Sequence, residues 1–176
     1  KMNINEMKIK DVSEETLRNY LNKLDKKSSL ILSNDLKVTH YQNGDPIPLA
    51  VSDDQWVEFG EAKIGAYSIN KVGDYLYNWY VVDDDRGICP EGWHVPSDEE
   101  WNKLNDQLRE NPSYNDYRGY DNGNYYNMGT YGNFWSSTVF DDDNAWYRRL
   151  HYNNSEVSRH YLNKRLGFSV RYVREK

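Results

Sequence analysis

Residues 87–104 read GICPEGWHVPSDEEWNKL and contain the clearest structural signal of this 176-residue chain. Ser97 stands where a helix N-cap would, and Glu100 follows three residues later, which is the capping-box pattern. The apolar residues that come next recur at helical spacing and predict one buried face: Trp101, Leu104 and Leu108. We therefore expect a helix to begin immediately after Ser97.

Short β-like pieces and turn signals surround this helix on both sides. Upstream, strands are expected over 30–32, 36–41, 64–69 and 75–82, and a short helix is expected to open near Ser52. Downstream, the expected strands cover 134–139, 145–152 and 168–173. Few helices and many short strands joined by long polar loops predict an α+β fold.

The N-terminal segment has a different texture. Apolar residues recur at helical spacing between Asp11 and Lys27, and either Asp11 or Ser13 can cap the helix. We expect residues 1–28 to form an amphipathic helix that serves as a linker or assembly segment. Its apolar stripe either packs on the following domain, residues 29–176, or makes a homo-oligomer with copies of itself.

Charge and cysteine content exclude several classes of protein. The net charge of −6 argues against nucleic acid and against an anionic membrane surface as the main partner. No run approaches the about 18 apolar residues of a membrane helix, so direct membrane insertion is not expected. A single cysteine excludes an internal disulfide. A local basic patch stays open near the C-terminus, at Arg148, Arg149, Arg159, Lys164, Arg165, Arg171 and Arg174.

From Tyr120 to Arg174 the chain interleaves aromatic rings with small polar side chains. Tyrosine and tryptophan supply large contact areas at low entropic cost, and Asn, Ser, Asp and His supply adaptable hydrogen bonds, as in antibody-type binding surfaces. We interpret this tract as a recognition surface.

Four further motifs, together with the stretch 87–104, resemble the Fibrobacter succinogenes major paralogous domain. They are VTHYQNGDPIP (38–48), LYNWYVV (76–82), FWSSTVFDDDNAWYRRL (134–150) and GFSVRYVR (167–174), and the resemblance spans Ser29 to Arg174. It implies a C-type-lectin-like fold related to the formylglycine-generating-enzyme subgroup, and an origin among Bacteroidetes surface proteins. Some members with this closing pattern look like the variable proteins of diversity-generating retroelements, in which the scaffold stays constant while C-terminal codons are rewritten.

This resemblance divides the C-terminal tract into a frame and replaceable positions. The frame is expected to contain Trp135, Ser136, Ser137, Trp146, Gly167, Phe168 and Val170. Most tryptophans in the family motifs are expected in the core: Trp79, Trp93, Trp101, Trp135 and Trp146. The ligand-binding candidates are Tyr131, Asn133, Phe140, Asp141, Asn144, Tyr147, Arg149, His151, Asn153, Asn154, Ser158, His160 and Asn163.

Alternation along residues 145–152 supports this division. If Trp146 and Leu150 face inward, then Tyr147, Arg149 and His151 face solvent or a ligand. Replacing Tyr147, His151 and Asn153 with Ala is therefore expected to leave thermal stability nearly unchanged.

Metal and catalytic alternatives are weaker. The acidic runs 83–85 and 141–143 lack EF-hand spacing, so solvated turns are favoured, although a structural calcium ion stays open. Cys89 and His94 suggest a nucleophile with its base, but a buried thiol and a hydrogen-bonded histidine are favoured. No other cofactor is expected.

We therefore expect a non-enzymatic module that binds a protein or glycan ligand. Its expected location is extracellular, on a bacterial cell surface or a phage virion. The alternative is a structural or adhesion module of a Bacteroidetes surface lipoprotein without hypervariability.

Overall fold

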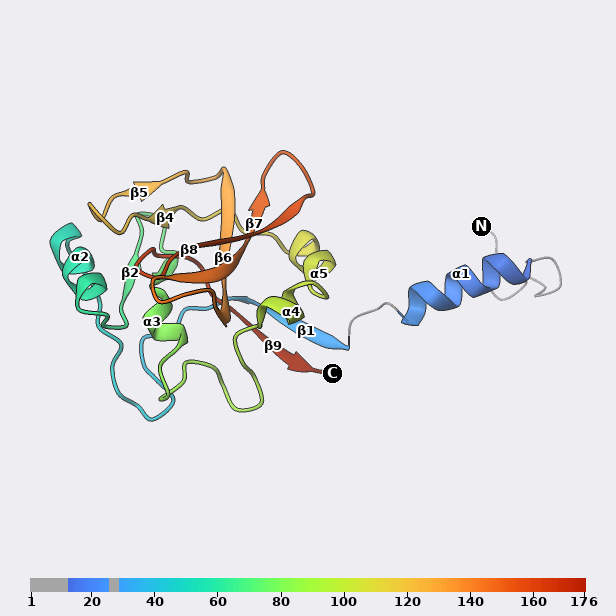
Figure 1. Cartoon of the computed structure of the whole chain (residues 1–176), viewed down its shortest axis with the longest axis horizontal. Coiled ribbons are helices and arrows are strands. Elements are labelled where there is room, and N and C mark those ends of the chain that lie inside the picture. The colour runs from blue at the N-terminus through green and yellow to red at the C-terminus, as the bar shows by residue number, and fades with distance from the viewer. Residues whose placement is uncertain (1–12, 26–28) are drawn as a thin grey trace.

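The structure is a computed structural model that describes residues 13–25 and 29–176, with side chains from residue 20 to residue 25 left out (Figure 1). Its helices are α1 (Glu14–Asp25), α2 (Asp53–Glu61), α3 (Trp79–Val82), α4 (Asp98–Trp101) and α5 (Asn105–Glu110). Its strands are β1 (Leu30–Asp35), β2 (Tyr67–Ile69), β3 (Tyr75–Tyr77), β4 (Tyr117–Arg118), β5 (Tyr125–Tyr126), β6 (Tyr131–Val139), β7 (Asn144–His151), β8 (Val157–Asn163) and β9 (Arg171–Glu175). These short helices and small antiparallel sheets confirm a mixed α+β fold.

Helix α1 begins where the sequence predicts. Ser13 Oγ accepts a hydrogen bond from the Thr16 N–H at 3.2 Å, so Ser13 is a cap. Leu17, a described member of the apolar stripe, is 43% exposed. The other expected stripe residues and the alternative cap lie outside the residues whose side chains are described: Asp11, Val12, Tyr20, Leu21 and Leu24.

The two ends of the 29–176 segment meet in one two-stranded sheet. Strands β1 and β9 run antiparallel with Leu30 opposite Glu175, and Figure 1 shows them side by side. The buried guanidinium of Arg171 donates to Asp35 Oδ1 at 2.7 Å and ties the end of β1 to β9. This pairing joins residues from the two ends of the segment.

Four expected strands are corrected by the structure. The stretches 64–69 and 168–173 are strands only from Tyr67 and Arg171 onward. The stretch 36–41 is not a strand; it contributes Leu36 and Tyr41 to the core as irregular chain. The stretch 75–82 is a strand only to Tyr77 and then turns into α3. The buried Asn78 stands at the start of α3 and anchors it to the preceding segment: its Oδ1 accepts the Ala66 N–H at 3.1 Å, and its Nδ2 donates to the Ile64 carbonyl at 2.9 Å.

The helix after residue 97 is confirmed, with its capping box complete. The Glu100 N–H donates to Ser97 Oγ at 3.1 Å, and the Ser97 N–H donates to the Glu100 carboxylate at 2.9 Å. The helical run is divided into α4 and α5, and the expected buried face survives across the division: Trp101, Leu104 and Leu108 are all fully buried. Ser52 likewise caps α2.

We expect Ser97→Ala to lower the free energy of unfolding by about 1 kcal/mol, because one N–H of the first helical turn loses its acceptor. Urea denaturation measures this change. Ser137→Ala is the matched control, since Ser137 is exposed and lies in β6 rather than at a helix cap. Equal stability of the two variants would contradict a capping role for Ser97.

The longest sheet is formed by β6, β7 and β8, each antiparallel to the next. Sequence periodicity did not predict β8, because VSRHYLN lacks an alternating apolar face and most of its residues are exposed. Pairing with β7 along seven residue positions, rather than burial, defines this strand.

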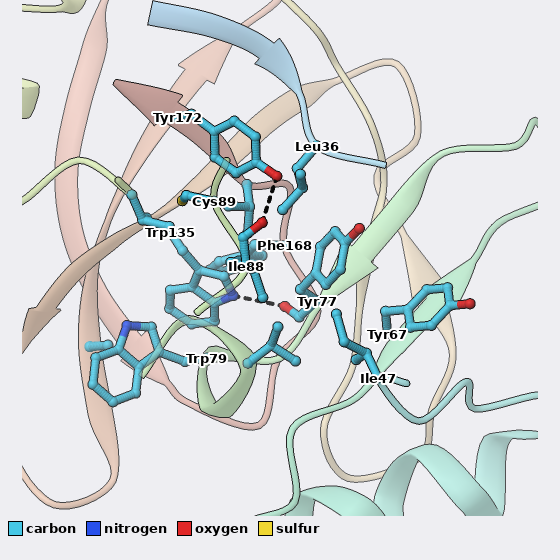
Figure 2. Close-up of a cluster of buried hydrophobic side chains, with 14 of the residues drawn as sticks. Leu36, Ile47, Tyr67, Tyr77, Trp79, Ile88, Cys89, Trp135, Phe168 and Tyr172 are labelled. Carbon is cyan, nitrogen blue, oxygen red and sulfur yellow. Dashed lines mark hydrogen bonds between the residues drawn. The ribbon is translucent and has the colours of Figure 1, made fainter. Parts of the chain in front are cut away.

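Two clusters of buried side chains cover opposite faces of this sheet. One contains Trp135, Tyr147 and Phe168, and the other contains Phe134, Leu150 and the buried face of α4–α5. Figure 2 shows the first cluster, in which Trp135 Nε1 donates to the Tyr77 carbonyl at 2.8 Å. Residues that alternate along β6 and β7 therefore enter different cores.

Candidate binding surface

The register of β6–β7–β8 gathers seven of the thirteen predicted ligand-binding residues on one face. Tyr131 lies opposite His151, the next same-face row joins Asn133, Arg149 and Ser158, and the row after that joins Trp135, Tyr147 and His160. We call this the sheet face; its predicted members are Tyr131, Asn133, Tyr147, Arg149, His151, Ser158 and His160.

Two of these seven are core residues, which corrects the predicted division of the strand. Tyr147 is 1% exposed and packs against Phe168, with ring centres 4.7 Å apart; Asn133 is 2% exposed. Alternation assigned Tyr147 outward because it assumed one covered face. Both faces of β7 are covered, so the triple Ala substitution expected to be harmless would remove the buried Tyr147 ring. That stability expectation is wrong.

The predicted tryptophan frame is also corrected in part. Trp79, Trp101 and Trp135 are buried as expected. Trp93 and Trp146 are only half-buried. Trp146 lies beneath the Arg159 guanidinium, whose carbon is 3.4 Å from the centre of the indole ring.

Arg149 lies at the middle of the sheet face. Its Nε donates to Asn133 Oδ1 at 3.0 Å, and its guanidinium carbon lies 4.9 Å from the centre of the Tyr131 ring and 5.5 Å from that of Tyr147. Burial raises the pKa of Tyr147, while the nearby Arg149 charge opposes this change. The buried amide and the rings hold one half-buried cation in place without an ion pair among the residues that the structure describes.

The rim of the sheet face is polar and aromatic. The Tyr131 and His151 rings meet edge to face with centres 4.5 Å apart, and His160 Nε2 lies 3.1 Å from Ser158 Oγ. Burial and the Arg149 charge lower the pKa of His160, against the opposing charge of Glu156, and this favours the uncharged imidazole. Within the described part of the chain, Asn133 Nδ2 and His151 Nδ1 are buried without a hydrogen-bond partner.

Two tyrosines that the sequence did not single out border this face. Tyr117 on β4 stacks on Tyr126 on β5 with ring centres 5.3 Å apart, and it meets Phe168 edge to face at 6.2 Å. Burial and Tyr126 raise the pKa of Tyr117, whereas the Arg149 charge acts in the opposite direction. Two-residue strands give no readable periodicity, so only the density of tyrosines in 114–126 could have indicated them.

Four candidates lie away from the sheet face, at the β6–β7 turn and the end of β8: Phe140, Asp141, Asn144 and Asn163. Asp141 Oδ1 accepts the N–H groups of Asp143 and Asn144, so this carboxylate closes the turn. Phe140 stacks on Tyr161, with ring centres 3.7 Å apart. Phe140, Tyr161 and Trp146 therefore form an aromatic cluster at the β6–β7 turn, apart from the sheet face.

Asn153 and Asn154 lie in the turn between β7 and β8, beside a hollow of about 330 Å³. Asn154 Oδ1 accepts the Glu156 N–H at 2.9 Å and so shapes the turn.

The sequence left open a basic patch near the C-terminus. Three of its seven residues cannot belong to a surface patch, because Arg148, Lys164 and Arg171 are buried.

The residues considered for catalysis are placed as the sequence favoured. Burial raises the pKa of the Cys89 thiol to about 12, so it is protonated at neutral pH. His94 is half-exposed at its side chain and lies 2.8 Å from the Glu100 carboxylate. Across the described residues, no group of three or more His, Cys, Asp or Glu side chains is arranged to hold a metal ion.

The short sheets around two aromatic cores define an α+β domain whose longest sheet presents a half-buried arginine among tyrosines and histidines. The chain belongs to the Fibrobacter succinogenes major domain family, whose model matches residues 32–123. That range includes the first three motifs and ends before the two closing motifs. Neither the curated proteins nor the solved structures contain a match to the chain. Of the helices described, none has the length and apolar character to cross a bilayer.

Proposed function

We propose that this chain is a non-enzymatic ligand-binding module and that the sheet face is its binding surface. The observation that carries the proposal is the β6–β7–β8 register, which places Arg149 among Tyr131, His151, Ser158 and His160. Rigid rings and adaptable polar groups on paired strands are the composition of protein recognition surfaces.

The chemistry of the sheet face favours a protein or glycan ligand that offers hydrogen-bond acceptors beside apolar groups. A guanidinium presents five N–H donors in a planar fork. Asn133 Oδ1 accepts from the Nε of Arg149, and the two terminal nitrogens of the guanidinium lie beyond that bond. Asn133 itself is buried, so its role is to hold Arg149 in place rather than to contact the ligand. Tyrosine rings alongside supply contact area for a sugar ring or an aliphatic side chain.

Family membership supports the further proposal of a C-type-lectin-like fold carrying a variable surface, as in the variable proteins of diversity-generating retroelements. An extracellular location on a bacterial surface or a phage virion accompanies that proposal. Sequencing near-identical genes tests it, because differences should concentrate after Tyr120 at sheet-face codons and spare the buried Asn133 and Tyr147. A constant tract with no neighbouring reverse transcriptase would favour the alternative, an adhesion module without hypervariability.

We expect the double variant Tyr131→Ala/His160→Ala to weaken ligand capture by tenfold or more, because both rings flank Arg149 on the sheet face and two truncated contact residues at about 1 kcal/mol each exceed a tenfold effect. Binding is measured on a glycan array and on intact bacterial cells by flow cytometry.

The matched control for that variant is Tyr120→Ala/His40→Ala, which removes the same side-chain types from exposed positions off the sheet. Both variants should melt close to the wild type. Equal binding by the double variant and the wild type would remove the sheet face as the binding surface.

A further inference from the structure

A second concave site lies between the turn after β2 and the β4–β5 hairpin. It is a hollow of about 390 Å³, and its lining residues are Lys71, Asp116, Tyr125, Tyr126, Asn127 and Met128. The volume is large enough for a small organic group. None of these residues belongs to the predicted binding set.

The feature that distinguishes this hollow is a buried carboxylate. Asp116 is 3% exposed, and its Oδ1 accepts one hydrogen bond from Asn70 Nδ2 at 2.7 Å. Within the described chain, no Lys, Arg or His nitrogen forms an ion pair with it. The pKa of Asp116 is raised, first by burial and also by the neighbouring Asp74. The negative charge is therefore poorly compensated in the empty site.

The same Asn70 amide links the two carboxylates. Its Nδ2 also donates to Asp74 Oδ2 at 3.1 Å, while its Oδ1 accepts the N–H groups of Val72 and Asp74. The Asn70 amide nitrogen therefore donates to both carboxylates, and its oxygen is used by the turn after β2. The charge of Asp116 is thus left for a group that enters the hollow.

The walls of the hollow suit the remainder of such a group. Tyr125 already faces the Arg118 guanidinium, whose carbon lies 4.9 Å from its ring centre. Tyr126 stacks on Tyr117 and is partly exposed, and Met128 is also exposed. Phenol rings and a thioether favour an alkyl stem and attract a cationic head.

We propose that the hollow bounded by Asp116, Tyr125 and Tyr126 binds an ammonium or guanidinium group, with the Asp116 carboxylate as its counter-ion. Free alkylamines and lysine or arginine side chains share this chemistry. The exposed Lys71 ammonium borders the site, and its like charge disfavours a cationic ligand. The hollow contains none of the sheet-face residues, although Tyr126 borders both sites.

NMR titration of the ¹⁵N-labelled domain at pH 7 tests the proposal with four probes: butylammonium, butylguanidinium, Nα-acetyl-lysine methylamide and the neutral control 1-butanol. The cations should give saturable shifts of the Asp116 and Tyr125–Met128 amides, and 1-butanol should not. Tighter binding of the lysine derivative than of butylammonium would indicate a peptide side chain as the source, and the reverse order a free amine.

Two charge variants give opposite expected results. Asp116→Asn should weaken the cations tenfold or more while retaining the Asn70 bond, and Lys71→Gln should strengthen them about threefold by removing a like charge at the rim. A thermal melt checks that each variant is folded, and Lys71→Gln keeps the proposal testable if Asp116→Asn does not fold. Binding of 1-butanol equal to that of the cations, or weaker cation binding by Lys71→Gln, overturns the proposal.

Discussion

Trp135→Ala is expected to lower the free energy of unfolding by about 3 to 5 kcal/mol, the range for truncating a fully buried large aromatic side chain. Trp135 is 0% exposed and packs against Phe168 with ring centres 4.3 Å apart. Its indole N–H also bonds the Tyr77 carbonyl (Figure 2), so truncation leaves both a cavity and an unpaired buried acceptor. Urea unfolding followed by circular dichroism measures the change.

Trp93→Ala is the matched control for this substitution. Both tryptophans were expected in the core, but Trp93 is half-buried. Its ring is covered on one side by Arg174, whose guanidinium carbon lies 4.9 Å from the ring centre. We therefore expect a clearly smaller loss. If both substitutions lowered the free energy of unfolding equally, the difference in burial between Trp93 and Trp135 would not explain their stability effects.

Asp98→Asn is expected to cost about 3 to 5 kcal/mol, because removing one partner of a buried ion pair leaves the other charge uncompensated. Arg148 is 1% exposed and donates to Asp98 Oδ1 at 2.6 Å; Arg159 donates to the same carboxylate from β8 at 2.8 Å. Asp98 thus connects α4 to both β7 and β8. Chemical denaturation at pH 7 measures the loss.

The pH dependence supplies an independent check of the same ion pair. Burial acts to raise the pKa of Asp98, but hydrogen bonds from Arg159 and Arg148 outweigh it and hold the pKa below its ordinary value of 3.8. A lowered folded-state pKa contributes stability above the unfolded pKa and loses it as the pH falls through the folded value. The stability difference between wild type and Asp98→Asn should therefore shrink below about pH 4.

Asp106→Asn is the matched control for that measurement, since its carboxylate also pairs with an arginine, Arg109, but is 90% exposed at the side chain. Exposed pairs contribute little, so this variant should stay within about 1 kcal/mol of the wild type. A gap between wild type and Asp98→Asn that stays constant from pH 7 to pH 3 would contradict the ion-pair explanation.

Local sequence signals determined the starts of α2 and α4, the α+β class and the family. Ser52 and Ser97 cap the helices that they were expected to open, because a cap depends on the N–H groups of the next three residues. The motifs at residues 38–48, 76–82 and 87–104 fall within the range that the family model matches, because such a match depends on the local sequence. Cys89 is the buried thiol that the sequence favoured.

Only the tertiary structure decided which side chains of the C-terminal tract are available to a ligand. Alternation separates the two faces of β7 but cannot say which core covers each face, and here Tyr147 enters one core while Leu150 enters the other. Strand β8 exists through pairing with β7, since its own side chains are mostly exposed. The sequence therefore determined the helix caps and the composition of the surface, and long-range packing determined which residues face outward.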